Sequence, residues 1–197
     1  KYSGDYPGYF ERKIEAHTNG SATFAAAGLG SHSYRSKGKN FEKAAYVGEG
    51  LADSLIAHLD KGDFSANANL QSKRIPIEIA DHQIRLTNNI RLAPWLARKL
   101  IKPQDAYIQL LALDNFILIG SPGEFSGELA LGLKAYATQL GNKISVTSFN
   151  GCYIGYVTAS KYYEMNSYET RLMSWFGPYT GDYLVELMKK SIDLLNG

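Results

Sequence analysis

The stretch 115–156 places the strongest constraint on how this chain can fold. It reads as a strand, a short Pro-Gly loop, an amphipathic helix, a second strand and a loop rich in tyrosine. Strands joined by such a crossover are parallel, and both loops then leave the same edge of the sheet, where open α/β sheets bind their ligands. Glu124 lies in the first loop and Tyr153 and Tyr156 lie in the second. We therefore expect a carboxylate and two phenols in one crevice.

Helical and extended patterns alternate along the rest of the chain. Capping residues and apolar residues at helical spacing predict helices over 7–19, 40–59, 94–101 and 182–195. Apolar runs or alternation predict strands over 22–27, 70–92, 107–113 and 116–119. Pro76 favours a sheet edge for its strand, and Asp114-Asn115 is a turn between the last two. The expected fold is α/β, a mixed β-sheet flanked by helices in a single domain over 1–197, with active-site loops at strand ends.

The composition excludes several classes of protein. Of the 197 residues, 45% are hydrophobic and 20% charged, which is typical of a soluble globular chain. A formal net charge of +2 without a basic block argues against nucleic acid as a partner. No apolar run approaches the ~20 residues that cross a bilayer. Cys152 is the single cysteine, so an internal disulfide is excluded, and a buried unreactive thiol is expected.

The residues that could carry chemistry also have plain structural interpretations. The histidines lack the i,i+2 or i,i+4 spacing of a metal-binding pair, so a zinc site built from them alone is not expected. Ser33 follows His32 in a small-residue loop without the G-x-S-x-G pattern, and adjacent side chains of an extended chain point apart. Glu124 could be a helix N-terminal carboxylate. The 14 tyrosines suit a cleft for amphiphilic or sugar-like ligands, or complete the edge of the core.

Several of these segments together resemble the catalytic domain of the neutral ceramidases, zinc amidases that split N-acylsphingosine. SGDYPGY at 3–9 resembles S-D-x-x-G-Y, GSHSY at 30–34 falls on G-D-V-S-P, and PGEFS at 122–126 resembles P-G-E-F-T. YIGYVT at 153–158 resembles Y-x-x-Y-[IV]-T, and FGPYT at 176–180 resembles Y-G-P-x-T. Tyr163 falls on the tyrosine of E-E-Y, and Tyr168 on that of x-Y-E. The segments occur in the family's order and span most of the chain.

This resemblance implies an activity and a set of site residues. Ser33 would be the nucleophile, activated by zinc-bound water, and Tyr168 would lie near the scissile amide. Glu124 and Tyr156 would be zinc ligands, with Tyr153 as the alternative ligand if the register slips. The implied reaction cleaves the N-acyl bond of ceramide, or of a related N-acylated amphiphile, to a fatty acid and an amine. The implied setting is extracellular, periplasmic or at the cell surface, with peripheral contact to a membrane.

Two departures from the family pattern leave alternatives open. The aspartate and proline of G-D-V-S-P are Ser31 and Tyr34 here, which also fits a non-catalytic lipid- or glycan-binding relative that keeps the cleft. The family's two histidine ligands precede the S-D-x-x-G-Y turn, which lies near Lys1. We therefore expect this chain to be the C-terminal portion of a longer catalytic domain, with the remaining zinc ligands upstream. A third interpretation makes Glu124 only a helix cap and the tyrosines only packing.

Overall fold

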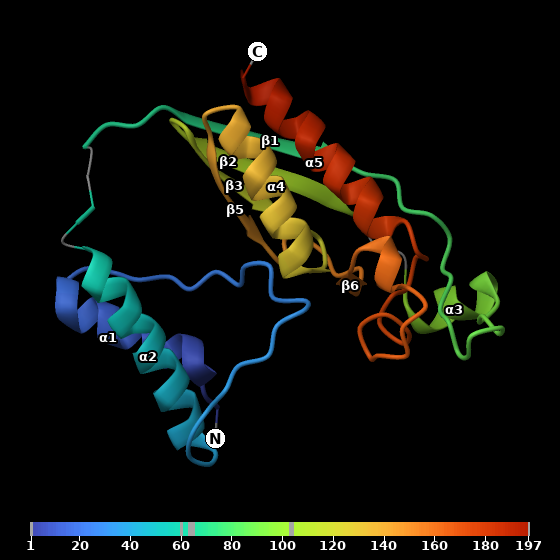
Figure 1. Cartoon of the computed structure of the whole chain (residues 1–197), viewed down its shortest axis with the longest axis horizontal. Coiled ribbons are helices and arrows are strands. Elements are labelled where there is room, and N and C mark those ends of the chain that lie inside the picture. Colours follow the sequence, from blue (N-terminus) through green and yellow to red (C-terminus); the bar gives the residue numbers. More distant parts are fainter. Residues whose placement is uncertain (1, 60, 63–65, 103–104, 197) are drawn as a thin grey trace. The chain divides into compact units, whose positions relative to one another are not determined.

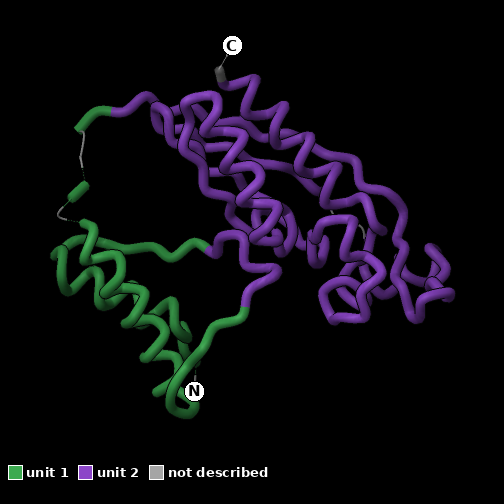
Figure 2. Tube along the Cα trace, viewed as in Figure 1, with its two compact units in different colours: residues 1–25, 33–67 green, residues 26–32, 68–197 purple. Residues whose placement is uncertain are grey.

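The computed structural model describes residues 2–59, 61–62, 66–102 and 105–196. These residues divide into two compact units (Figure 2): unit 1 comprises Lys1–Ala25 and Ser33–Asn67, and unit 2 comprises Ala26–His32 and Ala68–Gly197. The sequence did not indicate this division, since no linker or change in composition marks it. The expectation of one domain over 1–197 stays a prediction.

Unit 1 contains two helices that pack against each other, α1 (Asp5–Thr18) and α2 (Phe41–Leu59). Both were predicted, and α1 ends as expected at Asn19, whose left-handed backbone (φ 55°) is a common helix C-cap. Gly48 allows the close approach of the helices, because a Cβ atom there would lie 2.2 Å from the carbonyl oxygen of Tyr6.

Unit 2 contains a four-stranded mixed sheet in the order β1-β2-β3-β5 (Figure 1). Strands β1 (Leu70–Pro76), β2 (Tyr107–Leu113) and β3 (Phe116–Gly120) are antiparallel neighbours. Strand β5 (Lys143–Thr147) joins β3 in parallel after the crossover helix α4 (Gly127–Gln139). The predicted hairpin, crossover and edge position of Pro76 are confirmed, and so is the short helix α3 (Pro94–Leu100). The α/β fold class is therefore correct.

The core of unit 2 lies between the sheet and two helices that pack side by side on one face of it (Figure 1). Alternate residues of the strands point toward these helices and are buried, among them Leu110, Ile119 and Val146. Leu133 of α4 and Met188 of α5 (Thr180–Asn196) meet them and are fully buried. This alternation is what fixes the register of the strands, because a shift by one residue would expose the whole apolar set.

The strand predicted over 22–27 is wrong, because side chains take up backbone groups there. Within unit 1, the amides of Ala22 and Phe24 donate to the carboxylates of Glu15 and Glu11 at 3.2 and 2.8 Å. Within unit 2, the carbonyl oxygen of Ala27 accepts from the Ser148 hydroxyl at 2.8 Å. A run of alanines also offers little side-chain surface to a pleated sheet.

The alternation over 70–92 forms a strand only as far as Pro76, and most of the segment 77–92 is irregular. The tyrosine-rich segment after β6 (Tyr156–Val157) contains one short 3-10 turn, η1 (Ser160–Tyr162). None of the helices within the described ranges has the length and apolar character needed to cross a membrane.

Candidate active site

The two loops of the crossover unit meet in a second, very small parallel sheet. Strand β4 (Glu124–Phe125) pairs with β6 so that Glu124 lies opposite Tyr156. The amide of Glu124 donates to the carbonyl of Gly155 at 2.9 Å, and the amide of Ser126 donates to that of Val157 at 2.9 Å. Paired residues on strands about 4.8 Å apart point to the same face. The expected meeting of a carboxylate and phenols at one edge is confirmed.

Tyr153 joins this pair through its hydroxyl, which donates to Glu124 Oε1 at 2.5 Å. Phe149 stacks on the Tyr153 ring at 5.8 Å, and Trp175 meets its edge at 5.3 Å. Gly155, between the two tyrosines in sequence, has φ 83°, and a Cβ there would lie 2.3 Å from the Met173 carbonyl oxygen. Only glycine fits this turn without strain, and the turn brings both phenols to one carboxylate.

Tyr168 reaches the same group from the following loop. Its ring meets the Tyr156 ring edge-on at 5.8 Å, and 56% of the residue is exposed.

The loop that carries Tyr168 is anchored by Arg85, which is fully buried. The Arg85 guanidinium donates to Glu164 at 3.1 Å and to the Met165 carbonyl at 2.9 Å, and lies over the Tyr163 ring. Tyr168 is thus an accessible phenol on a segment that the contacts of Arg85 fix in place.

Burial and the neighbouring carboxylate keep the phenols of Tyr153 and Tyr156 protonated. Desolvation, followed by hydrogen bonding to Glu124 and its negative charge, raises the pKa of Tyr153 well above the ordinary value. The same causes, in the same order, raise the pKa of Tyr156. A cation bound to Glu124 would oppose that charge and favour ionisation of Tyr156.

Alkaline pH is therefore expected to destabilise the chain through these two tyrosines. Their folded pKa values lie above the unfolded value of about 10, so above that pH the unfolded chain loses protons that the folded chain keeps. The free energy of unfolding from urea titrations should fall as pH rises past about 10. Glu124→Gln should flatten this dependence in part, because burial remains. Equal slopes in both proteins would contradict the assigned cause.

Ser33 is exposed and irregular, and it belongs to unit 1, whereas the group around Glu124 belongs to unit 2. Its place as nucleophile beside that group stays a prediction. Ser31, two residues earlier, belongs to unit 2, and its hydroxyl accepts from the amide of Gly127 at 3.1 Å, at the start of α4. The interpretation of Glu124 as a helix cap is wrong, because α4 begins three residues later, after its N-cap Ser126.

The donors present fit part of a metal site. In the described part of the chain, no group of three or more histidine, cysteine, aspartate or glutamate side chains is arranged to hold a metal ion. Glu124 offers a carboxylate and Tyr156 a phenol on one face of the β4–β6 pair. Zinc takes four ligands in most sites, with oxygen, nitrogen or sulfur donors, so two more would have to come from elsewhere.

The sequence analysis did not identify three residues that shape this region. Arg85 lies in the middle third, where the family resemblance is weakest, and it contacts Glu164 across 79 positions. Phe149 precedes the tyrosine loop in the sequence and Trp175 follows it, and both rings pack against Tyr153. The abundance of aromatic residues around 149–179 was the one available hint that rings enclose the site.

Comparison with solved structures finds the same fold in ceramidases. The neutral ceramidase of Pseudomonas aeruginosa superposes with a TM-score of 0.73 at 17% identity, over 98% of this chain and 41% of that one. A structure described as ceramidase complexed with C2 gives 0.68 at 16% identity, over 98% and 42%. The chain thus spans less than half the length of these proteins. No family model and no curated protein matches the sequence.

Proposed function

We propose that this chain is part of a zinc-dependent amide hydrolase that cleaves the N-acyl bond of ceramide or of a related N-acylated amphiphile. The observation that carries the proposal is the pairing of Glu124 with Tyr156, with Tyr153 and Tyr168 against them. These residues fall on the motifs that resemble neutral ceramidase, in a fold that matches one over 98% of the chain. A fatty acid and an amine are the products.

Glu124 and Tyr156 would supply two of the zinc ligands, and histidines outside this chain would supply the others. Bound zinc polarises a carbonyl oxygen and lowers the pKa of water to about 7. Glu124 contributes the negative charge that attracts the ion. Tyr156 would bind the ion as a phenolate, and the Tyr153 hydroxyl, which donates to Glu124, holds that carboxylate in place.

Ser33 and Tyr168 would act on the amide itself. Ser33 Oγ would attack the amide carbon, the C–N bond would break, and the proton lost by Ser33 would leave on the amine nitrogen. Water then releases the fatty acid from Ser33. The exposed Tyr168 hydroxyl is suited to donate to the oxyanion that develops on the carbonyl oxygen, an interaction that contributes ~3 kcal/mol in comparable sites. Such substrates lie at membrane surfaces, so we expect peripheral membrane contact. The extracellular, periplasmic or cell-surface setting follows from the resemblance to neutral ceramidase alone.

Metal removal and substrate comparison test this function in the complete protein. The preparation should contain stoichiometric zinc and should hydrolyse an N-acylsphingosine. A chelator should abolish hydrolysis, and added zinc should restore it. An ester of the same acyl chain and an N-acyl amino acid serve as comparison substrates. Zinc-loaded protein that releases no fatty acid from either the N-acylsphingosine or the N-acyl amino acid contradicts the proposal.

A lipid- or glycan-binding relative without catalysis is the second candidate. It is favoured by the loop at 30–34, where Ser31 stands in place of the family's aspartate and its hydroxyl is engaged with Gly127. Such a protein would bind N-acylsphingosine or a glycan but would contain no zinc and would release no fatty acid. The metal content of the complete protein separates the two candidates.

A further inference from the structure

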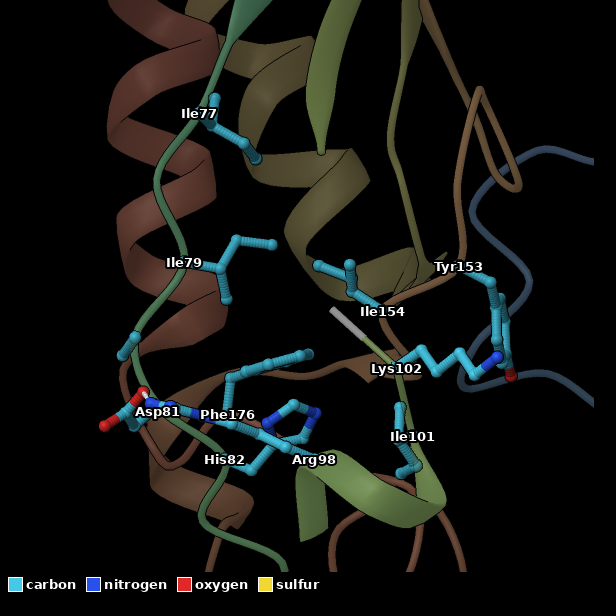
Figure 3. A pocket seen from close by; sticks show the side chains of 11 residues that line it. Ile77, Ile79, Asp81, His82, Arg98, Ile101, Lys102, Tyr153, Ile154 and Phe176 are labelled. Carbon is cyan, nitrogen blue, oxygen red and sulfur yellow. Dashed lines mark hydrogen bonds and ion pairs between the residues drawn. The ribbon is translucent and has the colours of Figure 1, made fainter. Parts of the chain in front are cut away.

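A cavity of about 240 Å³ lies in unit 2 and is lined in part by Tyr153, whose hydroxyl donates to Glu124 Oε1. It is bounded by the segment that follows β1, by α3 and by the start of the tyrosine loop (Figure 3). Ile77, Ile79, Ile154 and Phe176 give it an apolar wall. This volume lies just below the usual range for drug-sized ligands, about 300–1,000 Å³, and suits a smaller molecule.

A buried imidazole in the wall lacks a hydrogen-bond partner. His82 is 3% exposed, and its Nε2 atom makes no hydrogen bond within the described residues. Burial, and then the positive charge of Arg98, lower the pKa of His82, so the ring is neutral near pH 7. Phe176 packs against it with ring centroids 4.7 Å apart. Buried polar atoms are nearly always paired, so an unpaired one in a cavity wall indicates a ligand or water position.

Among the described residues that line the cavity, one ammonium group has no ion-pair partner. Arg98 is hydrogen-bonded to the carboxylate of Asp81, so these two offset each other. Lys102 is exposed, and none of the ion pairs of the described residues includes it. Figure 3 shows its side chain extending from the end of α3 toward Tyr153. The cavity therefore combines aliphatic walls with a single uncompensated positive charge among its described lining residues.

We infer that this cavity binds a monocarboxylate with a short alkyl chain, its carboxylate at Lys102 and its chain along the isoleucines. A cationic amphiphile would be repelled by Lys102, and a polyanion would find no second free cation among the described residues that line it. A neutral alcohol would gain the apolar contact alone. The inference does not depend on the proposed hydrolase, because binding to this chain requires neither zinc nor Ser33.

Calorimetric titration of the chain with octanoate, octanol, octylamine and acetate tests the inference. Octanoate should bind about tenfold more tightly than octanol, the effect of one favourable charge pair, and octylamine should bind more weakly than octanol because Lys102 repels it. Acetate should bind far more weakly, since each buried methylene contributes about fourfold. Lys102→Met should reduce octanoate to the affinity of octanol. Lys99→Met is the matched control, three residues earlier in the last turn of α3, because Lys99 lies over the Trp95 ring and outside the cavity, and it should change nothing.

The NMR signals of His82 provide an independent measurement. It needs no substitution of a buried residue, so it does not depend on the folding of a variant. The chain has four histidines, and octanoate should shift the nitrogen resonances of His82 while leaving those of exposed His17 and His58 unchanged. Equal affinities for the three octyl compounds, an equal loss in Lys99→Met, or unshifted His82 resonances at saturation would each overturn the inference.

Discussion

Ser33→Ala in the complete protein is expected to abolish amide hydrolysis while leaving bound zinc unchanged. Removing the nucleophile of an acyl-transfer enzyme lowers kcat by at least about 10³-fold, because the remaining groups can only stabilise a direct attack by water. Ser33 is exposed and lies in an irregular segment, so the substitution should not disturb folding. The measurements are fatty acid release and zinc content on the same preparation.

Ser36→Ala is the control for this experiment, since Ser36 lies in the same irregular segment of unit 1 and matches none of the quoted motifs. It should keep full activity. Hydrolysis at the wild-type rate by Ser33→Ala would remove Ser33 from the mechanism. Loss of zinc together with activity would instead give Ser33 a structural part in the metal site.

Glu124→Gln is expected to remove zinc from the complete protein and activity with it. Glutamine has the same size and can still accept from the Tyr153 hydroxyl, so the β4–β6 pair should form as before. The amide oxygen carries no charge, however, and is a poor ligand for zinc. Substituting the outer partners of metal ligands costs 10–100-fold in affinity, so losing a ligand should cost more than about 100-fold.

Glu128→Gln is the matched control, because Glu128 lies four residues later, is exposed, and pairs at the surface with Lys161. Exposed pairs contribute little to stability, so this variant should keep zinc and activity. Zinc content determined by mass spectrometry decides the result. Full metal occupancy in Glu124→Gln would contradict the metal-site proposal, whatever the activity.

The sequence predicted those parts of the fold that rest on local patterns. The hairpin of β2 and β3 has period-two alternation and a two-residue turn, and the crossover to β5 has a helical repeat between two apolar runs. Each of these signals lies within a few tens of residues. The residues that specify such an element lie within the element itself, so its type could be predicted from the local sequence.

The arrangement of the candidate site depended on contacts that no local pattern encodes. Strands of two residues have no periodicity, so the pairing of Glu124 with Tyr156 could be expected only as a general meeting of loops. The anchoring of the Tyr168 loop by Arg85 joins residues 79 positions apart, and an arginine in a polar stretch carries no sign of full burial. The hydrogen bond of Tyr153 to Glu124 was likewise unpredicted, although Tyr153 was named as the alternative ligand.

The small size of the β4–β6 sheet bears on how often Glu124 and Tyr156 separate through local opening. The ladder consists of two residue pairs, supported by the amides of Glu124 and Ser126, which donate to the carbonyls of Gly155 and Val157. Such a short ladder can open without unfolding the four-stranded sheet, at a free energy well below that of global unfolding. An ion held by Glu124 and Tyr156 would cross-link the two strands. Amide hydrogen exchange at these positions and affinity for the metal therefore report the same local opening equilibrium.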